Sequence, residues 1–169
     1  LRRPCVVCQQ ANELFGVRTR GTTFDSIPTD VSLLWIVQPK NLGNETLYAI
    51  DQFVMRGGKA MIFVDPVADN DPAAMQGMPQ GMPPMGQGSD LPVLFEAWGI
   101  DFTAQEVVAD AALALQVGGM DGRPVRHYGY LGVNAGRMSD DDIVTADLDV
   151  IHMATAGSFS LAENSPATL

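Results

Sequence analysis

Positive charge is scarce in this sequence. Ten lysines and arginines stand against twenty aspartates and glutamates, which gives the 169-residue chain a formal net charge of −10 at pH 7. Nucleic acids and anionic membrane surfaces bind proteins through cationic faces. The charge balance therefore argues against both as main partners. No apolar run is long enough to span a bilayer, so we expect any signal or membrane anchor to lie outside these residues.

Groups that could perform catalysis are also few. The chain has two histidines, His127 and His152, and two cysteines. It contains no G-x-S-x-G nucleophile motif and no glycine-rich phosphate loop of either common type. His127 lies in a predicted strand and His152 in an apolar run, which favours packed or surface histidines over general bases. We therefore predict no catalytic residue and no cofactor.

The two cysteines, Cys5 and Cys8, form a C-x-x-C pair. A thioredoxin-like pair normally follows a complete strand, but only four residues precede this one. A zinc site needs about four ligands, and the two histidines are the only other candidates of the usual kind. The pattern favours two small apolar residues that open a helix over residues 5–15. A disulfide between them is an open alternative if the domain is extracytoplasmic.

What the sequence does contain is one complete strand–loop–helix–strand unit at residues 32–66. Leu33–Val37 and Ala60–Val64 are apolar runs typical of strands buried on both faces. Asn44 is the predicted N-cap of the intervening helix, and Gly57 its C-terminal stop. Helical spacing predicts one buried face, made of Leu47, Ile50, Phe53 and Val54. Strands joined by a helix should be parallel, so the predicted class is α/β with a mostly parallel sheet flanked by helices.

The rest of the chain extends this unit into a single predicted α/β domain over residues 1–158. A segment rich in Met, Pro and Gly, residues 68–88, reads as a flexible insertion, and residues 159–169 as a polar tail. A helix is predicted at residues 91–98, ended by Gly99. Further strands are predicted at residues 106–110, 113–117, 126–133 and 150–154, with a hairpin turn at residues 118–124.

Candidate ligand-binding residues follow from the predicted sheet. In α/β folds ligands bind at the carboxyl ends of parallel strands. Pro39 and Lys40 follow the first strand of the unit and Asp65 follows the second, so these three are the candidate site. A cation bound by Asp65, Asp69 and Asp71 is an alternative, but an aspartate beside a solvated loop is the simpler interpretation. We predict no metal site.

The methionines of the insertion allow one further alternative. Thioethers spaced along a loop are soft ligands of the kind that Cu(I) selects. The insertion carries four of them, Met75, Met78, Met82 and Met85. Because no His or Cys lies nearby in the sequence, a plain linker is favoured over a copper site.

The central stretch carries a family resemblance. The run PKNLGNETLYAIDQFVMRGGKAMIFVDP, preceded by DVSLLWIVQ, resembles the signature of the GldG-type, gliding motility-associated auxiliary components of ABC transporters. The matching letters fall on Pro39-Lys40, Tyr48–Gln52, Gly57-Gly58 and Val64–Pro66. Weaker similarity extends over residues 9–158.

The resemblance implies a fold similar to class I glutamine amidotransferases, a flavodoxin-like arrangement, without their catalytic Cys–His pair. It also implies that the first strand of such a domain is missing from the sequence. Family members are extracytoplasmic (periplasmic) domains of inner-membrane proteins, which work beside an ABC permease and an ATPase. The expected function is therefore non-catalytic, the binding of a partner protein or a solute by a membrane-anchored auxiliary protein.

Two alternatives stay open. One is a degenerate or unconventional hydrolase of amidotransferase-like fold, which would need a polar pocket holding His127 or His152. The other is a sugar-binding module that uses Trp35 or Trp98 as a stacking platform. Both tryptophans lie in apolar segments that suggest the core.

Overall fold

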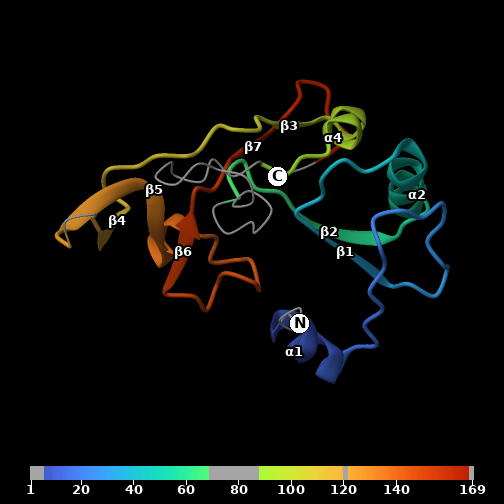
Figure 1. Ribbon diagram of the computed structural model, residues 1–169, viewed down its shortest axis with the longest axis horizontal. Coiled ribbons are helices and arrows are strands. Elements are labelled where there is room, and N and C mark those ends of the chain that lie inside the picture. Colours follow the sequence, from blue (N-terminus) through green and yellow to red (C-terminus); the bar gives the residue numbers. More distant parts are fainter. Residues whose placement is uncertain (1–5, 69–87, 120–121, 168–169) are drawn as a thin grey trace.

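The computed structural model describes residues 6–68, 88–119 and 122–167. Within these ranges the chain forms three α-helices, one 3-10 turn and seven strands in three small sheets (Figure 1). The helices are α1 (Val6–Leu14), α2 (Asn44–Met55) and α4 (Pro92–Trp98). The strands are β1 (Leu33–Val37), β2 (Lys59–Phe63), β3 (Ile100–Phe102), β4 (Ala114–Gly118), β5 (Pro124–Asn134), β6 (Val150–Ala154) and β7 (Phe159–Leu161), with the 3-10 turn at Ala135–Arg137.

The predicted strand–helix–strand unit is confirmed. Strands β1 and β2 pair in parallel, with Trp35 opposite Met61 and Val37 opposite Phe63. Helix α2 connects them, because parallel neighbours need a crossover connection. The helix starts one position away from the prediction: Asn44 is its first residue and Gly43 is the N-cap, without a side-chain hydrogen bond.

The expectation of a mostly parallel, flavodoxin-like sheet is wrong, although the α/β class stands. Strands β3 and β7 pair antiparallel, and so do the three strands of the β4–β5–β6 sheet. The reason lies in the connections. Strand β4 ends at Gly118 and β5 begins at Pro124, and the Gly119 N–H donates to the Arg123 carbonyl at 2.8 Å. A connection this short can join only antiparallel strands.

Two further segments differ from their predicted structure. Residues 106–110 form no strand. Instead, Asp110 Oδ1 accepts hydrogen bonds from the N–H groups of Ala112 at 2.6 Å and Leu113 at 3.1 Å. The two bonds form an Asx-type turn that leads into β4. They also lower the pKa of the Asp110 carboxyl group. The segment expected as a polar tail begins with β7, whose Phe159 pairs with Phe102 of β3.

The core lies on one side of the β1–β2 pair. Ile50 and Phe53 of α2 are each 1% exposed and form the centre of a cluster with Ile27, Leu91, Leu94 and Phe95. Leu34 and Ile36 of β1 and Ile62 of β2 pack against this cluster. The predicted buried face of the helix is thus confirmed, since Leu47 and Val54 also contact the cluster.

The opposite side of the same strands is exposed, which corrects the expectation that they are buried on both faces. Leu33, Trp35 and Val37 alternate along β1 with the core residues and are all exposed. The prediction failed because an unbroken apolar run indicates two apolar faces, whereas burial depends on whether a second layer covers them. In the view of Figure 1, α1 lies below the β1–β2 pair and α2 above it, and none of the residues of α1 is buried.

The end of α2 follows the predicted glycine stop. Gly57 has φ +90°, its N–H donates to the Val54 carbonyl, and the Gly58 N–H donates to the Phe53 carbonyl, both at 2.9 Å. This is the Schellman pattern, in which a left-handed residue satisfies the last carbonyls of a helix.

We predict that Gly57→Ala destabilises the protein by about 1 kcal/mol, because a Cβ is disfavoured at positive φ. No neighbouring atom would contact the added Cβ, so the cost is conformational. Gly21→Ala, likewise without contacts and at ordinary φ, is the matched control and should change stability by less than about 0.5 kcal/mol. Urea unfolding measures both, and equal effects would contradict the left-handed assignment.

Candidate functional site

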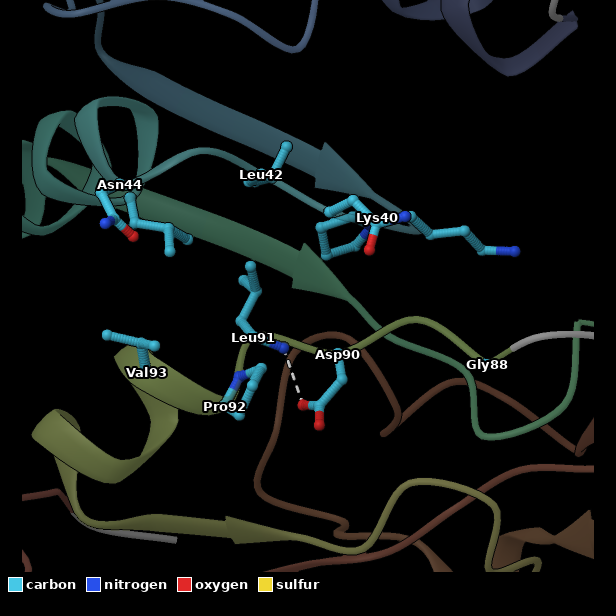
Figure 2. Close-up of a pocket in the computed structure, with 11 residues that line it drawn as sticks. Lys40, Leu42, Asn44, Gly88, Asp90, Leu91, Pro92 and Val93 are labelled. Atoms are coloured by element: carbon cyan, nitrogen blue, oxygen red, sulfur yellow. Dashed lines mark hydrogen bonds between the residues drawn. The ribbon is translucent and has the colours of Figure 1, made fainter.

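A cavity of about 380 Å³ lies where β1 ends and α2 begins (Figure 2). One wall comes from the β1–α2 connection and the other from the segment that enters α4. The volume is near the lower end of the range of small-molecule sites. The lining residues are Pro39, Lys40, Asn41, Leu42, Asn44 and Leu47 on the first wall, and Gly88, Asp90, Leu91, Pro92 and Val93 on the second.

The first wall is shaped by two residues with positive φ. Gln38 (φ 47°) and Asn41 (φ 51°) turn the chain away from the strand on either side of Pro39 and Lys40. The Gln38 N–H still donates to the Phe63 carbonyl at 2.9 Å, so the β1–β2 ladder extends to this point. Pro39 then ends it, because it has no N–H to donate. The turn therefore places a buried proline, Pro39, and a half-buried lysine, Lys40, at the carboxyl end of β1.

The second wall is held against the sheet by a pair of hydrogen bonds that we call the Asp65–Ser89 clasp. The Ser89 N–H donates to the Asp65 carbonyl at 2.7 Å, and the Asp65 N–H donates to Ser89 Oγ at 2.9 Å. Ser89 is only 1% exposed. Gly88 is required beside it, because a Cβ there would lie 2.5 Å from the Pro66 carbonyl oxygen. The clasp fastens residue 65 to residue 89 and sets the start of α4.

The three predicted ligand-binding residues do not all line this cavity. Pro39 and Lys40 line the cavity, whereas Asp65 does not. The Asp65 carboxylate accepts a hydrogen bond from the Val67 N–H at 3.0 Å, and its backbone forms the clasp. Asp65 thus supports the wall opposite Lys40 rather than lining the space.

The cavity combines apolar walls with one group of each charge. Leu42, Leu47 and Leu91 supply apolar surface, and the Leu91 side chain points toward the β1–α2 connection in Figure 2. Lys40 and the nearby N-terminus of α2 supply positive potential. The Asp90 carboxylate already accepts the Leu91 N–H at 2.7 Å. This combination suits a small solute with an apolar body and a carboxylate.

Sequence reasoning missed the second wall entirely. The helix predicted at residues 91–98 begins at Pro92, with Leu91 as its N-cap, and Ser89 forms the clasp instead of belonging to the helix start. Nothing local in residues 88–93 indicates that they face residues 39–47. The only available signal was the Gly-Ser-Asp run at the end of the insertion, which marks a tight turn without naming its neighbour.

A second cavity of about 330 Å³ lies on another side of α4, and its lining includes Asp90, Glu96 and Asp101. Among residues 6–68, 88–119 and 122–167, no group of three or more His, Cys, Asp or Glu side chains is arranged to hold a metal ion. Asp69, Asp71 and the four methionines of the insertion lie outside the described residues, so the calcium and copper alternatives are not tested.

The two histidines lie far along the chain from the first cavity and line neither cavity. Both are exposed in the antiparallel sheet, His127 on β5 and His152 on β6. The His127 ring packs on Tyr130, with ring centroids 4.1 Å apart. A hydrolase would need one of them in a polar pocket, so this placement does not favour that alternative.

The remaining sequence candidates are the tryptophans and cysteines. Trp98 is half-buried and its Nε1–H donates to Asp51 at 3.0 Å. Trp35 is 38% exposed and its ring tilts toward Phe63. Cys8 is disulfide-bonded, whereas Cys5 lies outside the described residues.

Together, the fold and the cavity define an α/β domain with a small, partly apolar site at the carboxyl end of a parallel strand. A family model described as an ABC-type uncharacterized transport system matches residues 2–169, and the chain belongs to that family. The protein is therefore an auxiliary component of an ABC transport system, which confirms the resemblance at this level. No curated protein and no solved structure matches the chain significantly. Within the residues described, no helix is long and apolar enough to cross a membrane.

We predict that Ser89→Ala destabilises the protein by about 1–3 kcal/mol, because it leaves the partly buried Asp65 N–H without its hydroxyl acceptor. Ser26→Ala is the control. Its hydroxyl donates to the exposed Asp25 side chain, so its effect should stay within about 0.5 kcal/mol. Thermal or urea unfolding compares the two, and equal losses would show that the hydroxyl bond of the clasp adds nothing to stability.

Proposed function

We propose that this chain is a non-catalytic, extracytoplasmic binding domain of a membrane-anchored auxiliary protein of the gliding-motility type. In this role it works beside the permease and the ATPase of an ABC system. The ligand is a small solute with an apolar body and a carboxylate, bound in the cavity between residues 39–47 and 88–93. The cavity, with Lys40 at the carboxyl end of β1, is the observation that carries the proposal.

The position of this cavity supports a binding role. In α/β domains the carboxyl ends of parallel strands are the usual ligand sites, and β1–β2 is the parallel pair. The Asp65–Ser89 clasp and the core beneath α2 fix both walls in advance. A preformed site loses less conformational entropy on binding than one that must be ordered by its ligand.

Membership of a family of transport auxiliaries supports a non-enzymatic role. The exposed positions of His127 and His152, outside both cavities, agree with it. The disulfide of Cys8 supports the extracytoplasmic location, because disulfides persist in oxidising compartments such as the periplasm and are rare in the cytosol.

The cavity is tested by thermal unfolding with a defined panel of amino acids, succinate, benzoate and tripeptides, each compared with its amide or uncharged analogue. We expect at least one carboxylate to raise the unfolding temperature, since a ligand at 100 times its Kd adds about 2.7 kcal/mol. Lys40→Ala should abolish the shift. Lys59→Ala, which removes the other lysine of the chain and lies on β2 away from the cavity, should keep it.

Either of two results would overturn this assignment: no carboxylate binds at millimolar concentration, or Lys40→Ala binds as well as the parent. Hydrolysis of an ester or amide probe that is lost in His127→Ala or His152→Ala would instead support the hydrolase alternative.

The location is tested in cells. Protease added to spheroplasts that express the complete gene product should degrade an epitope placed at Gly21, an exposed loop position, while a cytoplasmic control protein stays intact. Protection of the epitope until the membrane is lysed would rule out an extracytoplasmic domain.

A further inference from the structure

Helix α1 lacks the packing that usually keeps a short helix folded. None of its nine residues is buried, and its apolar side chains include Val7, which is 55% exposed, and Leu14, which is 79% exposed. The core cluster contains no residue of α1. A helix of this length is marginal in water, because forming its first turn is unfavourable by a factor of about 1,000. The helix therefore needs a stabilising contribution other than apolar burial.

The hydrogen bonds at the end of α1 do not supply it. The Phe15 N–H donates to the Ala11 carbonyl at 2.8 Å, and the Val17 N–H donates to Asn12 Oδ1 at 3.3 Å. Both bonds join the helix to the residues that directly follow it, so they extend α1 without fastening it to the core. The ion pair that comes next along the chain, between Arg18 and Asp30, is exposed, and such pairs contribute little to stability.

The first turn of α1 carries a covalent constraint instead. Cys8 is the third residue of the helix and is disulfide-bonded. The sequence has only one other cysteine, Cys5, so within one chain the bond links positions three residues apart. Positions at this spacing are neighbours on an α-helix. The bond thus restricts the unfolded chain to compact conformations of these four residues, which lowers the cost of forming the first turn.

This disulfide is accessible to a reductant. Cys8 is half-buried, and the residues beside it along the helix are exposed, namely Val6, Val7, Gln9 and Gln10. A dithiol reduces such a bond in two exchange steps. One thiolate of the dithiol attacks a disulfide sulfur and releases one cysteine, and its second thiol then releases the other. The protein gains two electrons and two protons as two thiols, and the dithiol becomes a disulfide.

We propose that the Cys8 disulfide is a redox-sensitive conformational switch. While the bond is intact, α1 is helical and holds Val7, Ala11 and Leu14 on one side. When a dithiol reduces the bond, the nucleation cost returns and residues 6–14 unfold, which disperses that apolar side. Helical α1 is then restricted to oxidising compartments, where disulfides persist.

The switch is confined to the start of the chain, because the following segment has its own attachments to α2. The Phe24 N–H donates to Thr46 Oγ1 at 3.2 Å, and Thr46 is 1% exposed. The Arg56 guanidinium donates to the Ile27 carbonyl. Neither contact involves α1, so the core and the cavity should keep their structure after reduction.

The test is hydrogen–deuterium exchange of the purified chain, read by mass spectrometry with and without dithiothreitol. We expect the dithiol to lower the amide protection of residues 6–14 by about tenfold or more, while the protection of α2 and β5 stays unchanged. Cys8→Ser should show the low protection under both conditions. Gln9→Ser, at an exposed neighbouring position, is the matched control. It keeps both cysteines and should lose protection only when dithiothreitol is present.

The intact mass of the same samples checks the bond itself. Without the reductant, the chain should be a monomer lighter by two hydrogen atoms than the reduced chain. Free thiols or a disulfide-linked dimer would overturn the proposal. So would an α1 without measurable protection when oxidised, or an α1 equally protected in both states. Loss of protection in α2 and β5 as well would also overturn it, because the disulfide would then stabilise the whole domain.

Discussion

The burial of Ile50 and Phe53 beneath the β1–β2 pair is the interaction on which the rest of this structure depends. Both side chains are 1% exposed, and burying side chains of this size contributes about 2–3 kcal/mol each. They contact the inner face of the two strands on one side and the α4 region on the other, through Leu91, Leu94 and Phe95. Helix α2 covers only one face of the β1–β2 pair. The side chains on the other face are therefore exposed.

The cavity is a consequence of the same packing. Its first wall is the connection between β1 and α2, and its second wall is the segment that delivers Leu91 and Leu94 to the core. The Asp65–Ser89 clasp fixes where that segment leaves the sheet. Because both walls are continuous with buried residues, the core and the two hydrogen bonds of the clasp restrict the position of Lys40 relative to Leu91.

A structural feature could be predicted from the sequence when the residues that determine it are close together along the chain. The strand–helix–strand unit, the left-handed Gly57 and the Gly99 stop were predicted correctly, since periodicity and glycine act locally. The antiparallel pairing of β3 with β7 joins residues about sixty positions apart, and no local pattern specifies it. The same holds for Ser89, whose neighbours suggest a helix cap although its hydroxyl accepts from Asp65 across the insertion.

The exposed outer face of the β1–β2 pair shows a different limit of sequence reasoning. An unbroken apolar run such as Leu33–Val37 states that both faces of a strand are apolar, but it does not say what covers each of them. Leu34 and Ile36 meet α2 and the core, while Leu33, Trp35 and Val37 face outward. Strand β1 therefore carries an apolar surface along its outer face and ends at the cavity, with only Gln38 between Val37 and Pro39. A molecule that covers the outer face must contact the strand that positions Lys40, so the two surfaces of this auxiliary domain share a single rigid element.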